Sequence, residues 1–249
     1  MLPSDLRQAE SQALQALQSA LAGGSPRRWT VDLRFEGLKV LPLALRLAAR
    51  LLERTPDLKL VFSDAGATAL ARRDGGALAP LILSLSDQHR RQTSALEGEG
   101  EGEGEGEALA AEREGHSSET LLLVAPSPSD YALVEAVCTT HAGPVVLLNP
   151  TLEDGAVGIG SVARARRKGF LAQWQAAYFL QPFANAALRR AHPDDWELYR
   201  LDADGFRLAA RFPQKPTAEE QDTALIGESG GGLGDPLRSL GTLIDTLQR

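Results

Sequence analysis

TLLLVAPSPSDYALVEAVCTTHAGPVVLLNP, residues 120–150, contains two apolar segments at 121–124 and 145–148. Between them, after two prolines and two serines, the pattern YALVEAVC is typical of a helix with one apolar face. Two apolar strands joined by one helix of this length form a parallel pair with a right-handed crossover. The stretch therefore predicts an α/β fold with a parallel sheet.

The chain on either side of this stretch repeats the alternation of strands and helices. Strands are expected at 29–35, 58–66 and 175–183, and residues 79–87 are expected to form either a further strand or an edge segment. Helices are expected at 6–21, 41–54, 67–74 and 157–171, the first of them capped by Ser4 and ended by Gly23 and Gly24. The predicted fold class is α/β, with three layers and a mostly parallel, Rossmann-like sheet flanked by helices.

The segment WELYRLDADGFRLAARF, residues 196–212, departs from this alternation. Two alternating runs flank Asp202, Ala203, Asp204 and Gly205, which is the signal of a β-hairpin. Because hairpin strands are antiparallel, we expect them to extend one edge of the sheet.

The domain organisation is predicted from changes in composition. Residues 1–226 are expected to form a single α/β domain that carries a disordered acidic Glu-Gly insertion at about 88–119. A flexible linker at 227–234 and an amphipathic helix at 235–249 are expected to follow. This last helix either docks on its own domain or binds a partner or a membrane surface, and the carboxylates of the insertion leave a calcium site as a further alternative.

The charge and the cysteine content of the chain exclude several classes of protein. The formal net charge is −7, but the EGEGEGEGEGE repeat alone contributes −6, so the rest of the chain is near neutral. This balance argues against an extended nucleic-acid surface. The single cysteine, Cys138, excludes an intramolecular disulfide and a thiolate metal cluster. No secretory signal and no apolar run of about 20 residues is present, so we expect a soluble, cytoplasmic protein.

The glycine-rich turn NPTLEDGAVGIG, residues 149–160, raises the question of a phosphate site. Its glycines, Gly155, Gly158 and Gly160, read G-x-x-G-x-G, the reverse of the dinucleotide fingerprint, and no phosphate-binding P-loop is present. Two interpretations remain. The amides at the start of the following helix could hold an anion, or the glycines serve close packing while the arginines form a solvated face. Catalytic motifs of the G-x-S-x-G and H-E-x-x-H types are absent from the sequence.

Candidate ligand contacts are the polar residues that follow the predicted parallel strands, because ligands of open α/β sheets bind beyond the carboxyl ends of the strands. For Asp64, Ser127 and Asn149, helix capping, turn formation and satisfaction of strand-end amides are the structural alternatives. The candidates are Arg34, Asp64, Ser127, Asn149, Glu153, Gly158, Gly160 and Arg164. No catalytic residue, metal ligand or cofactor is predicted.

Several segments together resemble a known family. They are MLPSDLRQA, FSDAGATALARRD, LLLVAPSPSD, PVVLLNPTLEDGAVGIG, FLAQWQAAYFLQP and LRRAHPDDWELYR. The chain is similar in them to a domain-of-unknown-function family of cyanobacteria and chloroplasts. That domain occurs in the plant protein required for low photosystem II accumulation phenotypes, and it is fused behind the kinase region of a chloroplast adenylate kinase.

The resemblance implies an accessory role. We expect a non-enzymatic interaction protein that assists photosystem II assembly, with photosystem II subunits or assembly factors as partners, no nucleic acid, and at most peripheral contact with the thylakoid surface. The kinase activity does not transfer, because its phosphate loop belongs to the other region. The alternative is a nucleotide- or phosphometabolite-binding enzyme that uses the crevice at the carboxyl ends of the parallel strands.

Overall fold

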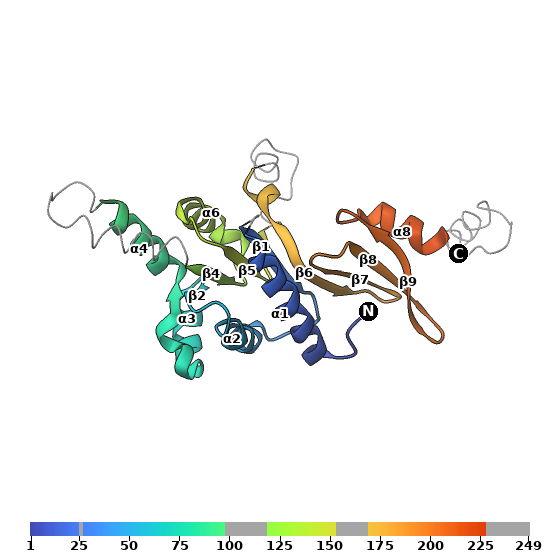
Figure 1. Cartoon of the computed structure of the whole chain (residues 1–249), viewed down its shortest axis with the longest axis horizontal. Coiled ribbons are helices and arrows are strands. Elements are labelled where there is room, and N and C mark those ends of the chain that lie inside the picture. The colour runs from blue at the N-terminus through green and yellow to red at the C-terminus, as the bar shows by residue number, and fades with distance from the viewer. Residues whose placement is uncertain (25–26, 98–118, 153–168, 228–249) are drawn as a thin grey trace, which may run out of the picture.

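A computed structural model describes residues 1–24, 27–97, 119–152 and 169–227. These residues form one nine-stranded sheet with the strand order β3-β2-β4-β5-β1-β6-β7-β8-β9 (Figure 1). Neighbouring strands from β3 to β6 are parallel, and those from β6 to β9 are antiparallel. Helices lie on both faces, so the predicted fold class is confirmed.

The parallel part of the sheet corresponds closely to the predicted apolar runs. Its strands are β1 (Arg28–Leu33), β2 (Leu58–Phe62), β3 (Ile82–Ser84), β4 (Thr120–Val124), β5 (Val145–Leu148) and β6 (Gln175–Pro182). All residues of β4 and β5 are buried. A strand covered on both faces reads as a continuous apolar run, which explains why these two were the clearest in the sequence.

The helices divide between the two faces of the sheet (Figure 1). On one face lie α1 (Leu6–Ala22), α2 (Val40–Leu51) and α3 (Ala65–Asp74), which share a hydrophobic core with β1, β2, β4 and β5. On the other face α4 (Leu85–Glu97) and α6 (Tyr131–Thr140) cover the parallel strands. On that face α8 (Ala218–Gly227) packs Ala224 and Leu225 against the antiparallel strands.

The predicted hairpin is confirmed, and it belongs to a larger antiparallel addition. Strands β8 (Trp196–Asp202) and β9 (Gly205–Phe212) pair around the turn, where Gly205 has a φ of +125° that favours glycine. Sequence reasoning missed β7 (Ala186–Ala191), which joins the hairpin to β6. Its sequence, AALRRA, lacks β-branched and aromatic residues, and pairing on both sides holds it in the sheet.

Three local predictions are corrected. Asp5 caps α1 by accepting a hydrogen bond from the amide of Gln8, a role predicted for Ser4. Helix α4 continues to Glu97, so the stretch predicted to be disordered from about 88 begins as a helix. The predicted helix at 157–171 lies largely outside the described residues, and Phe170–Gln173 form a 3₁₀ turn, η5.

A buried polar network ties α1 to the antiparallel strands. Arg189 of β7 donates from Nη1 to Oε2 of Glu197 at 2.7 Å, and the hydroxyl of Tyr199 donates to the same oxygen at 2.8 Å. Both charged side chains are only 8% exposed. Arg189 Nε and the hydroxyl of Tyr178 both donate to Oε1 of Gln12 in α1. The network fixes the position of α1 over β6 and β7.

A second set of hydrogen bonds joins β1 to the end of α6. Arg28 donates to the carbonyl oxygens of Cys138, His141 and Gly143 at 2.6 to 2.9 Å. A cation at a helix C-terminus satisfies carbonyls that have no partner within the helix. No helix in residues 1–24, 27–97, 119–152 or 169–227 is both long enough and apolar enough to cross a membrane.

Candidate functional site

A cavity of about 420 Å³ lies over the junction between the parallel and antiparallel strands. Its floor is a row of side chains set by strand register. Asp32 of β1 pairs with Phe179 of β6, and Phe179 pairs with Arg190 of β7. Arg190 then reaches the ring of Trp196 in β8. Because directly paired residues project to the same face of a sheet, these four side chains line one surface.

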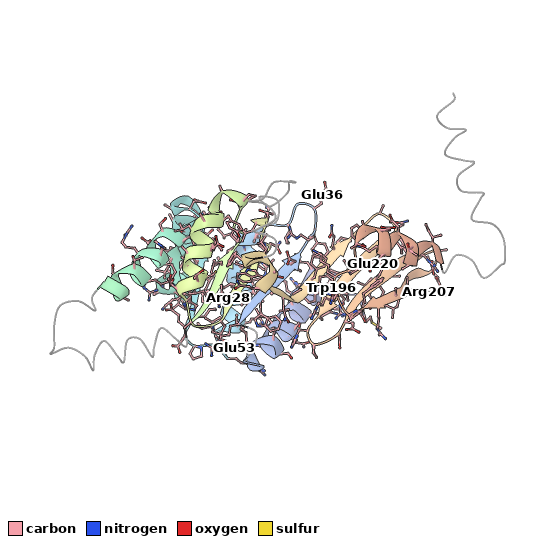
Figure 2. The ribbon with its side chains drawn as sticks, turned by 90° about the horizontal axis from the view of Figure 1, so that it is seen from above. Arg28, Glu36, Glu53, Trp196, Arg207 and Glu220 are labelled. Atoms are coloured by element: carbon pink, nitrogen blue, oxygen red, sulfur yellow. The ribbon has the colours of Figure 1, made fainter. Side chains whose placement is uncertain are left out.

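The walls of the cavity come from segments that are distant in the sequence. They include Leu171 of η5, Trp174, which follows η5, and Lys215 in the loop after β9. Pro150 and Leu152, which follow β5, complete the apolar part of the lining. Figure 2 places Trp196 between the parallel strands and the antiparallel addition. The cavity thus lies in the gap between the helices that cover the two parts of the sheet.

Asp32, the only carboxylate among the lining residues that the structure describes, is 5% exposed. Arg34 donates from Nη2 to its Oδ1 and to the carbonyl oxygen of Pro150, both at 2.6 Å. Burial raises the pKa of the Asp32 carboxyl, and the positive charges of Arg34 and Lys215 oppose that rise. Asp32 therefore serves to hold Arg34 across the ends of β1 and β5.

Two further cations border the cavity. The ammonium of Lys215 lies 4.9 Å from the ring centre of Phe179 and 5.9 Å from that of Trp196. The guanidinium of Arg190 lies 5.7 Å from the ring centre of Trp196, and its pKa is lowered by burial. Cation–π contacts of this kind position a cation without neutralising it. The described residues of the lining thus carry three cations and one carboxylate, an excess of two positive charges.

Two hydrogen-bond donors of the lining residues are buried and have no partner in the described part of the chain. They are Nε1 of Trp174 and Nε of Arg190. A buried donor that lacks an acceptor costs about 1–3 kcal/mol. Because buried polar groups in folded proteins are normally paired, these two donors are available to an acceptor that enters the cavity.

Three predicted contacts are used to build the backbone around the sheet. Asp64 accepts a hydrogen bond from the amide of Ala67 and caps α3. Ser127 and Asp130 form a capping box for the 3₁₀ turn η3 (Pro128–Asp130). Asn149 accepts from the amide of Leu33 and donates to its carbonyl oxygen, so it joins the ends of β5 and β1. These are the structural alternatives that the sequence had left open, and none of the three lines the cavity.

Of the eight predicted contacts, Arg34 is the described one that lines the cavity. Glu153, Gly158, Gly160 and Arg164 lie outside the described residues. The glycine turn, with its anion hypothesis, therefore remains a prediction.

The described residues contain no group of three or more His, Cys, Asp or Glu that could hold a metal ion. Burial raises the pKa of the Cys138 thiol to about 12 and that of the Tyr178 hydroxyl to about 12, so both stay protonated near neutral pH. The ring of His192 packs against Trp29 at 4.9 Å, and burial lowers its pKa.

Sequence reasoning missed Asp32, Trp174, Arg190, Trp196 and Lys215. Asp32 appeared as the polar half of an alternating strand, and Arg190 fell in a strand that was not predicted. One signal was available: the polar residues 30, 32 and 34 alternate along a central strand, where an all-apolar sequence is expected if both faces are packed. Their partners could be identified only from the order of the strands.

One protein-family model matches residues 3–223, nearly the whole of the described chain, and its description is domain of unknown function (DUF1995). The chain belongs to this family. No curated protein and no solved structure matches the chain. The DUF1995 match spans both the parallel strands and the antiparallel addition, so both parts of the cavity lining lie within the family domain.

Proposed function

We propose that this DUF1995 protein is a non-enzymatic accessory protein that binds a partner protein and assists photosystem II assembly. The observation that carries the proposal is an exposed apolar surface on the antiparallel strands. Leu201 and Phe206 are each 45% exposed, and Leu208 is 38% exposed. Large apolar side chains gathered on one surface are typical of sites for protein partners.

Strand register places these side chains on one face. Leu201 pairs with Phe206, and Tyr199 pairs with Leu208. Paired residues, and residues two apart in a strand, project to the same side. Ala187 of β7 pairs with Tyr199, which extends the same face toward β6. We name Leu201, Phe206 and Leu208 the apolar strand surface.

The apolar strand surface continues into a groove of about 650 Å³. Phe206 lines the groove together with Leu2 and Leu6 near the N-terminus and Phe35 and Leu38 after β1. Strand β9, the N-terminal segment and the segment after β1 thus form one apolar depression. Its volume and its apolar lining suit an apolar segment of a partner protein, such as an amphipathic helix laid into the groove.

The identity of the partner is proposed from the resemblance of the sequence to the family of cyanobacteria and chloroplasts. On that ground the partner is a photosystem II subunit or an assembly factor, and the protein works on the cytoplasmic side of the thylakoid membrane with at most peripheral contact. The near-neutral charge outside the glutamate repeat is compatible with an apolar rather than an electrostatic interaction.

The test is affinity capture with the full chain from a cyanobacterial extract, with photosystem II subunits and assembly factors quantified by mass spectrometry. We expect these proteins to be enriched with the parent chain and lost with the double variant Phe206→Ser, Leu208→Ser. The matched control is Leu70→Ser, since Leu70 is 40% exposed on α3, far from this surface.

Capture that does not depend on Phe206 and Leu208 would contradict the role of the apolar strand surface. A deletion strain that keeps its full level of photosystem II would contradict the assembly role. Circular dichroism of each variant establishes that the fold is intact before capture is compared.

The alternative function is a nucleotide- or phosphometabolite-binding enzyme. The observation that favours it is the cavity bordered by Arg34, and the adenylate kinase fusion implied by the resemblance adds a link to nucleotide biology. A panel of nucleotides and sugar phosphates is screened by thermal shift, because a ligand at 100 times its dissociation constant stabilises by about 2.7 kcal/mol. Unchanged melting temperatures across the panel, with no turnover, would exclude it.

A further inference from the structure

The geometry points to the Asp32–Trp196 cavity as a binding site for a phosphate monoester carried on a ring-sized apolar body. The inference goes beyond the accessory role, because it assigns a small ligand to a face of the sheet opposite the apolar strand surface. It also differs from the site predicted from the sequence, since Arg190, Lys215 and Trp174 carry it.

The charges of the cavity lining indicate the phosphate group of the ligand. Arg34, Arg190 and Lys215 border the cavity, and Asp32 is the one carboxylate among the described lining residues. Asp32 binds Arg34, and within the described residues Arg190 and Lys215 form no ion pair. Asp195, outside the lining, offsets the charge of Arg190 only in part. Two cations that form no ion pair within the described residues match the dianion of a phosphate monoester at neutral pH, and guanidinium groups bind such oxygens well.

The size of the cavity and its apolar lining indicate the apolar body of the ligand. A volume of about 420 Å³ lies within the range of about 300–1,000 Å³ that is typical of small-molecule sites. Besides the cations, the lining includes apolar surface from the side chains of Leu147, Leu152 and Leu171 and from the indole of Trp174. An inorganic anion would leave this surface in contact with water, whereas an organic phosphate with a ring-sized body would cover it.

Unsatisfied donors provide an independent observation. Nε1 of Trp174 and Nε of Arg190 are buried without an acceptor among the described residues, and both residues line the cavity. Buried N–H groups are normally paired in folded proteins. A ligand that offers several acceptor oxygens is the simplest way to satisfy donors at both positions.

The test is isothermal titration calorimetry of the full chain with four probes: phenyl phosphate, inorganic phosphate, benzoate and phenol. Phenyl phosphate combines the ring and the dianion, and each of the others lacks one property. We expect phenyl phosphate to bind at least about tenfold more tightly than any of the other three, because charged hydrogen bonds and apolar burial contribute together.

Two cavity variants and one control complete the test. Lys215→Gln and Arg190→Gln are expected to weaken phenyl phosphate binding by about tenfold or more. Arg54→Gln, which removes the same charge from an exposed position outside the cavity, should leave it unchanged. Lys215 is exposed, so its variant stays informative even if Arg190→Gln fails to fold.

Equal affinity for phenyl phosphate and benzoate would refute the claim that the site selects a dianion. Equal affinity for phenyl phosphate and inorganic phosphate would refute the claim that the ligand carries an apolar body. No binding of phenyl phosphate, or equal weakening by Lys215→Gln and Arg54→Gln, would overturn the site. None of these results bears on partner capture through Phe206 and Leu208, so failure of this inference and failure of the accessory role are distinguishable.

Discussion

The buried pair of Arg189 and Glu197 gives the sharpest prediction for stability. The change is Glu197→Gln, which keeps the shape of the side chain and removes its charge. Arg189 would then remain in the interior, only 8% exposed, with its charge opposed by no carboxylate in its hydrogen-bond shell. Removing one partner of a buried ion pair costs about 3–5 kcal/mol.

The structure sets the expected value near the lower end of this range. The amide oxygen of glutamine can still accept from Arg189 or from the hydroxyl of Tyr199, which lie 2.7 and 2.8 Å from Oε2. We therefore expect a loss of about 3 kcal/mol in the free energy of unfolding. Because domains are stable by only about 5–15 kcal/mol, this loss is a large share of the total.

The assay is urea unfolding followed by far-ultraviolet circular dichroism. The matched control is Asp204→Asn, whose carboxylate pairs with Arg207 in the open and is 65% exposed, so no measurable change is expected. The double variant Arg189→Met, Glu197→Met tests the cause, since replacing both charges by apolar groups is often neutral. We expect it to be more stable than either single methionine variant.

A loss of at most about 1 kcal/mol for Glu197→Gln is the value of a solvent-exposed pair. That result, or a double methionine variant whose loss equals the sum of the two single losses, would refute the reasoning. It would mean that water reaches Arg189 in the native state.

Three further predictions follow. Hydrogen bonds from Tyr199 and Arg189 lower the pKa of Glu197 below 4.5 against the effect of burial. A carboxyl whose pKa is lower in the folded protein than in the unfolded chain stabilises the fold at pH values above its unfolded-state pKa. This stability is lost as the pH falls through its folded-state pKa. Unfolding free energies between pH 7 and pH 3 should therefore fall less steeply in Glu197→Gln, and identical acid profiles would contradict the assignment. Arg28→Met should lower the free energy of unfolding by about 2 kcal/mol, because the carbonyl oxygens of Cys138, His141 and Gly143 lose a charged donor. Arg27→Met, at an exposed position with one such bond, should lower it less. Equal losses in urea unfolding would argue against the role of Arg28 at the end of α6. The thiol of Cys138, buried and with its pKa raised to about 12, should react with a disulfide reagent at pH 8 only as fast as the protein unfolds, and rapid labelling of the native chain would show that α6 opens locally.

Much of the parallel part of the fold could be predicted from local sequence. The runs around Leu121–Val124 and at β5 are apolar throughout because both faces of these strands are covered. The turn at Gly205 was equally readable, since a tight hairpin needs a residue that tolerates positive φ. The structural uses of Asp64, Ser127 and Asn149 were also foreseen as alternatives, because capping is a local interaction.

The cavity could not be predicted in the same way. Asp32 and Phe179 are neighbours only because β1 and β6 pair in parallel, and Arg190 joins them only because β7 turns back along β6. The sequence by itself determined most of the parallel strands and helices and the cap at Asp64, since these depend on residues a few positions apart, whereas β7 depends on its pairing with β6 and β8. Strand order alone decided which side chains face one another, because contacts between residues some 150 positions apart leave no local pattern in the chain.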